Sequence, residues 1–499
     1  MKYSCFISAG SQKTVCSGRF IFGSGEKGPK LEKNDAFALC VEASGEAVLF
    51  ARGERARRFA AAEAGRLAGK ELFTGTYVYE PEFDIRGIIE GFYGRPWSMD
   101  ERRRVLGLLA EHGMNEYFYG PKDDPFHRDR WDELYGENDA YTLRELIGIA
   151  AENCMEFRYM LAPGLSIRYS SQEDREKLYA KYRQVMSFGV RKFGLLLDDL
   201  EKAELYPEDA EKYPRQVDAH IELVNDVFAF IKSLDPDAGL IVCPTQYWGG
   251  LDQDYIVSLG RGIPAECEMF FTGPYICSDE LTVAEAEGFF ASTGHRAVWW
   301  DNYPVNDAEM VDELHILPLR GREAGLGKAS RGLVANPMEL AETSLVPLLT
   351  VADCLWNSGA YDPEESWDAA LSEVCGNTAE NVAALGKFCY KSCLSRDGHH
   401  FEFVRHEGRN SDFDSALAAG GEALENYLEK CGALFAGLLD SGTKIASECD
   451  RWIRTAKEFC DAGMELLKTG NGGRMKKYLC RDEDVMKREA CKMLDIFVK

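Results

Sequence analysis

Two adjacent carboxylates, Asp198 and Asp199, are the residues of this sequence best suited to acid–base chemistry. They follow the run Phe-Gly-Leu-Leu-Leu at 193–197, and carboxylates beside such an apolar run are costly unless they are paired or used. Like charges held close together raise the pKa of one carboxyl group and leave the other ionised. One acid and one carboxylate are the pair that cleavage of a glycosidic bond uses. The alternatives are an N-cap of the next helix and an ion pair with Lys122 or Arg95.

Further polar and aromatic residues follow the ends of other predicted strands. Aromatic side chains there would stack on the apolar face of a sugar ring, while amides and carboxylates would hold its hydroxyl groups. Taken singly, each is also typical of a core, turn or capping position. These residues are Phe92, Tyr93, Trp97, Lys122, Tyr247, Trp248, Trp299, Trp300, Asn302, Asp307 and Asn336.

The elements that must position these residues are short apolar strands separated by helical patterns. Eight such units predict an α/β fold, a parallel sheet closed into a (β/α)8 barrel. An open doubly wound sheet is the alternative, but no Gly-x-Gly-x-x-Gly turn follows the first strand. Active sites of such barrels lie at the carboxyl ends of the strands. The expected strands are Arg86–Glu90, Glu116–Tyr119, Phe157–Leu161, Lys192–Leu197, Gly239–Cys243, Glu268–Thr272, Ala297–Trp300 and Gly332–Val334.

Different patterns flank the predicted barrel. Before it, strands at Ala36–Val41 and Glu46–Ala51 and a helix at Glu54–Leu72 predict a small N-terminal α/β domain. After it, strand signals fade and helical periodicity predicts a C-terminal helical bundle, with a break at Gly432. The expected domains are therefore 1–83, 84–360 and 361–499. The expected helices of the tail are 366–373, 378–394, 414–438, 443–468 and 482–497.

The composition excludes several classes of function. Lys and Arg number 58 against 83 Asp and Glu, a net charge of −25, which disfavours binding to nucleic acid or to anionic membranes. No signal peptide or apolar membrane span is visible, and the 16 cysteines form no Cys-x2-Cys pair. We therefore expect reduced thiols and a cytoplasmic location. Motifs for metal, serine-nucleophile and nucleotide chemistry are absent, so we expect no metal and no cofactor.

Seven sequence blocks, in order along the predicted barrel, resemble glycoside hydrolase family 84. This family includes O-GlcNAcases and bacterial β-N-acetylglucosaminidases. The regions flanking the barrel also resemble the domains that flank it in bacterial members. The blocks are RGIIEGFYGRPW (86–97), YGPKDDPFHR (119–128), LLLDD (195–199), CPTQY (243–247), FTGP (271–274), VWWDN (298–302) and ANP (335–337).

The resemblance implies a retaining β-N-acetylglucosaminidase that uses the acetamido oxygen of its substrate as the nucleophile. Asp198 would then orient the acetamido group, and Asp199 would act as general acid and then as general base. Tyr247 would bind near the acetamido group, and Trp300 would form a wall of its pocket. The remaining implied sugar-binding residues are Gly91, Lys122, Asn302, Asp307 and Asn336.

The implied partner is a glycan or glycoprotein that carries N-acetylglucosamine. Two alternatives remain open, a hexosaminidase that acts on free oligosaccharides and a non-catalytic, lectin-like barrel. An intact Asp198-Asp199 pair disfavours the lectin, because a pure binding protein needs no acid. The oligomeric state and the natural aglycone do not follow from the sequence.

Overall fold

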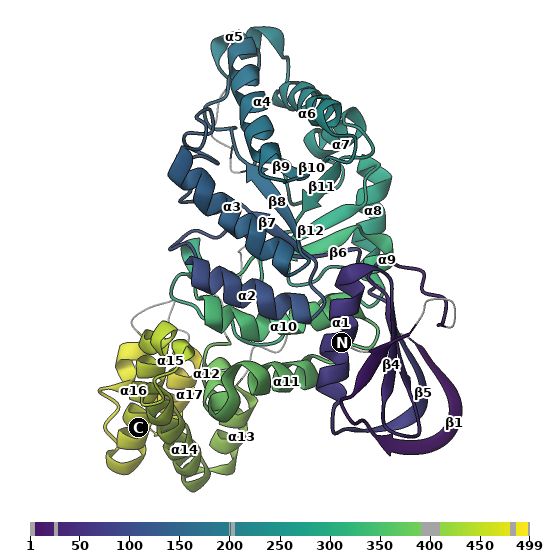
Figure 1. Ribbon diagram of the computed structural model, residues 1–499. Coiled ribbons are helices and arrows are strands. Elements are labelled where there is room, and N and C mark those ends of the chain that lie inside the picture. The colour runs from purple at the N-terminus through teal and green to yellow at the C-terminus, as the bar shows by residue number, and fades with distance from the viewer. Residues whose placement is uncertain are drawn as a thin grey trace.

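The computed structural model describes residues 5–23, 28–198, 200, 205–390, 410–479 and 486–497 (Figure 1). Its central strands are β6 (Ile85–Glu90), β7 (Glu116–Tyr119), β8 (Glu156–Leu161), β9 (Lys192–Leu196), β10 (Gly239–Cys243), β11 (Glu268–Phe271), β12 (Ala297–Asp301) and β13 (Gly332–Ala335). All eight are parallel and close into a barrel, with β13 paired to β6. The predicted barrel is therefore confirmed.

Apolar side chains fill the inside of the barrel. Ile89, Phe118, Met160 and Phe270 are among the fully buried residues of this cluster. A Cβ atom at Gly194 would collide with the Met160 side chain, so glycine in β9 makes room for the methionine. The barrel interior is thus a packed core, and a ligand must bind at its rim.

Helices cover the outside of the barrel (Figure 1). Most strand-to-strand connections hold one long helix, but the connection from β12 to β13 holds only η2 (Ala308–Met310) and α9 (Leu326–Ala329). The long, irregular part of this connection contains predicted site residues. The other helices are α2 (Met99–Glu111), α3 (Glu137–Glu152), α4 (Gln172–Ser187), α5 (Pro207–Lys212), α6 (Gln216–Leu234), α7 (Asp254–Gly262), α8 (Val283–Thr293) and α10 (Ala341–Trp356).

The N-terminal region forms a five-stranded sheet with one helix, α1 (Gly53–Leu67). The predicted helix at Glu54–Leu72 is wrong at its end. The chain turns at Gly69, whose φ is +77°, and then continues as a strand of the sheet. The strands, in the sheet order β1-β5-β3-β4-β2, are β1 (Cys5–Val15), β5 (Glu71–Tyr79), β3 (Phe37–Val41), β4 (Ala47–Ala51) and β2 (Phe20–Phe22).

A buried ion pair connects the N-terminal region to the barrel. Arg86 of β6 donates from Nη2 to Asp35 Oδ2 at 2.6 Å, and the two side chains are 1% and 7% exposed. The other nitrogens of Arg86 donate to the carbonyl oxygens of Gly113 and Phe83, each at 2.7 Å. Trp356 at the end of α10 packs in the apolar core of the N-terminal sheet. The N-terminal sheet and the barrel are therefore connected by a buried ion pair and by apolar packing.

Helices make up the described part of the chain after residue 361, as predicted. The break predicted at Gly432 is wrong, because one helix continues through it and the chain breaks at Gly420 instead, where φ is +109°. Residues 391–409, which include part of the helix predicted at 378–394, lie outside the described residues. The helices are α11 (Pro363–Cys375), α12 (Ala379–Phe388), α13 (Ser411–Ala419), α14 (Gly421–Leu439), α15 (Lys444–Glu448), α16 (Asp450–Thr469) and α17 (Lys487–Phe497).

The described residues also bear on membrane insertion and on the state of the cysteines. Among the residues that the structure describes, no helix has the length and apolar character needed to cross a bilayer. Most cysteines with described side chains are buried, free thiols, which agrees with the expectation from the sequence. The domain limits at residues 84 and 361 stay predictions.

Candidate active site

A cavity of about 320 Å³ lies at the carboxyl ends of the barrel strands. This volume is near the lower end of the range for small-molecule sites, roughly 300–1,000 Å³, and suits one sugar ring better than a polymer. Eight predicted site residues line it, and Asp199 lies outside the described residues. The eight are Gly91, Lys122, Asp198, Tyr247, Trp300, Asn302, Asp307 and Asn336.

A hydrogen-bond network fixes the wall of the cavity formed by β12 and β13. Trp300 donates from Nε1 to Asn302 Oδ1 at 2.9 Å, and Asn336 donates from Nδ2 to the same oxygen at 3.1 Å. Asn302 in turn donates from Nδ2 to the Ile276 carbonyl oxygen at 2.9 Å. These bonds determine how each amide is oriented and hold the indole of Trp300 in place.

One atom of this wall lacks a partner among the described residues. Asn336 is only 4% exposed, and its Oδ1 accepts no hydrogen bond. A buried acceptor without a donor costs about 1–3 kcal/mol, so such atoms are rare away from ligand sites. Because Asn336 lines the cavity, this oxygen is placed to accept a hydrogen bond from a hydroxyl group of a bound molecule.

Gly91 permits the close approach of β6 to Trp300. A Cβ atom at position 91 would lie 3.0 Å from Cζ2 and 3.2 Å from Cη2 of the indole. A larger side chain would therefore push on a ring that its hydrogen bond to Asn302 holds fixed.

Lys122 and Asp198 form an ion pair in the lining of the cavity. Lys122 Nζ lies 3.7 Å from Asp198 Oδ2, and the side chains are 9% and 11% exposed. The ion pair considered for Asp198 from the sequence is therefore present, and the nearby ammonium favours the ionised carboxylate. Lys122 Nζ also lies 5.0 Å from the ring centroid of Tyr93, a residue on the loop after the neighbouring strand β6 that lines the same cavity.

Asp307 connects the β12–β13 connection to the loop after β6. Its Oδ2 accepts a hydrogen bond from the backbone N–H of Tyr93 at 2.8 Å, although the two residues are 214 positions apart. The next residue, Ala308, has a φ of +49°, which is unusual for a residue other than glycine. The backbone is thus bent sharply beside a carboxylate that lines the cavity.

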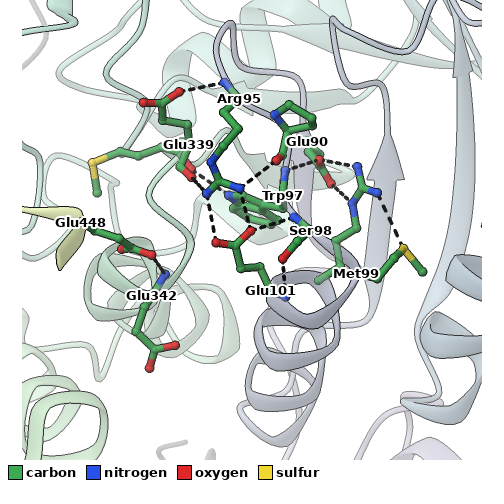
Figure 2. Close-up of polar contacts among 12 residues, drawn as sticks. Glu90, Arg95, Trp97, Ser98, Met99, Glu101, Glu339, Glu342 and Glu448 are labelled. Carbon is green, nitrogen blue, oxygen red and sulfur yellow. Dashed lines mark hydrogen bonds and ion pairs between the residues drawn. The ribbon is translucent and has the colours of Figure 1, made fainter. Parts of the chain in front are cut away.

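A second network supports the loop after β6 from outside (Figure 2). The Arg95 guanidinium makes two 2.9 Å hydrogen bonds to Glu101, which lower the pKa of that carboxyl group to about 2. The Arg95 backbone N–H donates to Glu339 at 2.8 Å, and Trp97 Nε1 donates to the Met338 carbonyl at 3.2 Å. Arg95 therefore pairs with Glu101 and joins the loops that follow β6 and β13.

Beneath these loops lies a fully buried carboxylate. Glu90, the last residue of β6, accepts two hydrogen bonds from Arg102 of α2 at 2.9 and 2.7 Å. It also accepts one from the backbone N–H of Trp97 at 3.2 Å and one from the Tyr117 hydroxyl group. Glu90 therefore fixes the path of the chain directly before and after Gly91.

Several residues that line the cavity were not among those predicted from the sequence. Thr272 ends the predicted sixth strand, so the rule that sites follow strand ends should have found it. Glu309 and Met310 lie in the irregular β12–β13 connection, where no periodic pattern shows which side chains face inward. Cys243 and Cys277 also line the cavity and were considered only as core thiols.

Comparison with known proteins identifies the family. A family model described as beta-N-acetylglucosaminidase matches residues 86–389. The chain belongs to this family, glycoside hydrolase family 84. The match covers the whole barrel with its site, together with α11 and α12, and it confirms the family that the seven sequence blocks indicate.

The individual relatives share a third or less of their aligned residues with this chain. The Protein O-GlcNAcases of Rattus norvegicus and Mus musculus are each 33% identical over 272 residues, which is 53% of this chain and 29% of theirs. The chain thus matches under a third of the length of these curated relatives. A solved O-GlcNAc hydrolase mutant of Thermobaculum terrenum is 29% identical, with a TM-score of 0.71 over 84% of this chain and 91% of that chain. CpGH84B, at 21% identity, shares the fold, with a TM-score of 0.78 over 99% and 93%.

Proposed function

We propose that this chain hydrolyses terminal β-linked N-acetylglucosamine and retains the anomeric configuration. The observation that carries the proposal is the convergence, on one sugar-sized cavity in a family-84 barrel, of eight residues that the family resemblance implies for the site. No metal or cofactor takes part in the proposed reaction.

The reaction proceeds in two steps that use the acetamido group of the substrate. In the first step the acetamido oxygen attacks the anomeric carbon, the glycosidic bond breaks, and Asp199 gives its proton to the departing oxygen. The product is a bicyclic oxazoline that is protonated on nitrogen, because the acetamido N–H stays in place beside Asp198. In the second step water gives a proton to Asp199 and attacks the anomeric carbon, which reopens the oxazoline and restores the acetamido group. This is an exception to the scheme in which an enzyme carboxylate is the nucleophile.

The other residues bind and orient the sugar. Asp198, whose Oδ2 lies 3.7 Å from Lys122 Nζ, accepts a hydrogen bond from the acetamido N–H and stabilises the positive charge that develops as the oxazoline forms. Tyr247 binds near the acetamido group, and Trp300 forms a wall of its pocket. The unpaired Oδ1 of Asn336 accepts a hydrogen bond from a sugar hydroxyl group.

The substrate class is a glycan or glycoprotein with a terminal N-acetylglucosamine. The names of the curated relatives, Protein O-GlcNAcase, favour protein-linked sugar as the natural substrate. Free oligosaccharides are the second candidate, because a cavity of about 320 Å³ contacts little more than the terminal ring in either case.

The test is hydrolysis of an aryl β-N-acetylglucosaminide and of the matching aryl β-glucoside. We expect cleavage of the N-acetyl compound only, because the glucoside lacks the nucleophile. Equal cleavage of both compounds would contradict the acetamido mechanism. Cleavage of neither by folded protein, with binding of N-acetylglucosamine retained, would favour the lectin-like alternative.

Gly91→Ala tests the contact between β6 and Trp300. The new methyl group would displace the Trp300 indole, and overpacking of this kind typically costs about 1–3 kcal/mol of free energy. We therefore expect KM for the N-acetyl substrate to rise about tenfold. Steady-state kinetics on the aryl substrate measures this. The control is Gly148→Ala in α3, where an added Cβ has open space, and its KM should not change. An unchanged KM in Gly91→Ala would remove Trp300 from the binding site.

A further inference from the structure

One short segment of the C-terminal helical region contacts the connection between β12 and β13 and also the first turn of α10. This segment, Glu448–Trp452, spans the end of α15 and the start of α16. Its side chains reach the β12–β13 connection on one side and the start of α10, which follows β13, on the other. These connections carry Asp307 and Asn336, respectively, two of the residues that line the cavity.

The contact with the β12–β13 connection involves two side chains. Trp452, which is 7% exposed, donates from Nε1 to the Asp312 carbonyl oxygen at 2.7 Å. Arg451 donates to the Val311 carbonyl oxygen and lies 3.2 Å from the Asp312 carboxylate. The guanidinium also covers the Trp452 ring, 3.9 Å from its centroid. Two consecutive backbone carbonyls of the connection are thus held by one helix.

These carbonyls belong to the turn that carries the lining residues. Met310, which lines the cavity, donates from its backbone N–H to the Asp307 carbonyl oxygen at 2.8 Å. Glu313 donates in the same way to the Met310 carbonyl oxygen, also at 2.8 Å. Residues 307–313 therefore form one hydrogen-bonded unit. It is held at Asp307 by the Tyr93 backbone and at Val311 and Asp312 by α16.

The second contact is at the start of α10. Glu448 accepts a hydrogen bond from the backbone N–H of Glu342 at 3.1 Å (Figure 2). It also accepts one from the backbone N–H of Thr343 at 2.8 Å and one from the Thr343 hydroxyl group at 2.6 Å. A carboxylate at this place satisfies free N–H groups of the first turn and interacts favourably with the helix dipole. The α10 start is in turn tied to the loop after β13, because the Met338 backbone N–H donates to Ser344 Oγ at 3.1 Å.

We infer that Glu448–Trp452 is a positioning element of the active site, with Trp452 as its main residue. Trp452 acts through Asp312 to hold the 307–313 turn, and so the Asp307 carboxylate, in the geometry that binds substrate. The kinetic part of this inference rests on the proposed function, whereas the position of the turn can be measured without any substrate.

The test is Trp452→Phe, which removes the indole N–H and keeps an aromatic ring. We expect KM for the aryl N-acetylglucosaminide to rise about fivefold with kcat little changed, as loss of one ordinary hydrogen bond would give. Hydrogen–deuterium exchange should show faster exchange at the amides of Met310 and Glu313 in the variant. A general loss of folded protein would instead lower the apparent kcat and leave KM unchanged.

Trp367→Phe is the matched control. Trp367 of α11 donates from Nε1 to the Ile316 carbonyl oxygen at 2.7 Å, which is the same kind of bond from the helical region to the same connection. Ile316 does not line the cavity, so KM and the exchange of Met310 and Glu313 should stay as in the wild type. If Trp452→Phe fails to fold, Arg451→Gln is the second variant. Because the ion pair of Arg451 with Asp312 is exposed to solvent and therefore weak, we expect a smaller rise in KM and a smaller increase in exchange than in Trp452→Phe.

The outcomes separate the two proposals. A higher KM together with faster exchange at the turn, in the Trp452 variant alone, would support the positioning role. Unchanged KM and exchange in Trp452→Phe, or equal changes in both tryptophan variants, would overturn it. If the wild type cleaves no N-acetylglucosaminide, the proposed function fails, and the exchange comparison alone decides whether this segment holds the turn.

Discussion

Asp198→Asn should lower kcat/KM for aryl β-N-acetylglucosaminides by about 10²–10³, whatever the leaving group. The substitution keeps the size of the side chain and removes the negative charge opposite Lys122, so the charge that develops on the acetamido group loses its main stabilising partner. Removal of one preorganised electrostatic group typically has an effect of this size. The measurement is kcat/KM on two aryl glycosides whose phenols differ in acidity.

The control for Asp198→Asn is the same substitution at an aspartate outside the cavity. Asp237→Asn changes an exposed turn residue between α6 and β10 and should leave kcat/KM as in the wild type. Turnover by Asp198→Asn at the wild-type rate would rule out assistance by an oriented acetamido group.

Asp199→Asn should give a loss that depends on the leaving group. An acidic phenol departs with little help from an acid, so the first step should slow only modestly with this substrate. With a poor leaving group, the rate of the first step should fall by the full contribution of a general acid, about 10²–10⁴-fold. Because the same residue is the base of the second step, the intermediate should accumulate with the activated substrate. Rates on a series of aryl glycosides measure the dependence, and a burst of phenol release measures the accumulation.

A second measurement isolates the base. Azide, a nucleophile that needs no deprotonation, should restore turnover of the activated substrate in Asp199→Asn and form the β-glycosyl azide. No such rescue is expected in Asp198→Asn, whose defect lies in forming the intermediate. Equal losses on good and poor leaving groups would remove Asp199 from the acid role.

The sequence predicts the barrel well because each of its strands is buried on both faces. Such strands appear as short apolar runs, and the limits predicted for Glu116–Tyr119 and Gly239–Cys243 agree with the structure. The strands β1 and β2 of the N-terminal sheet were missed for the opposite reason. They lie at the two edges of the sheet, and residues such as Ile21, which is 68% exposed, produce no hydrophobic alternation.

The candidate site was predictable to the extent that its residues follow strand ends. Lys122, Asn302 and Asn336 were found in this way, and they line the cavity. The arrangement of the β12–β13 connection was not predictable. It depends on contacts between distant parts of the chain, such as Tyr93 with Asp307 and Asp312 with Trp452, and neither leaves a periodic signal in the sequence.

The ion pair between Arg86 and Asp35 limits how this protein can be dissected. A shortened form that starts at the barrel would lack Asp35, the partner of Arg86 in the first barrel strand. Removal of one partner of a buried pair typically costs about 3–5 kcal/mol, a large part of the stability of an ordinary domain. We therefore expect residues 84–499 alone to unfold at a much lower temperature than the full chain in a thermal melt. The smallest autonomous catalytic unit should include the N-terminal sheet, whose loss would disrupt the enzyme even though none of its described residues lines the cavity.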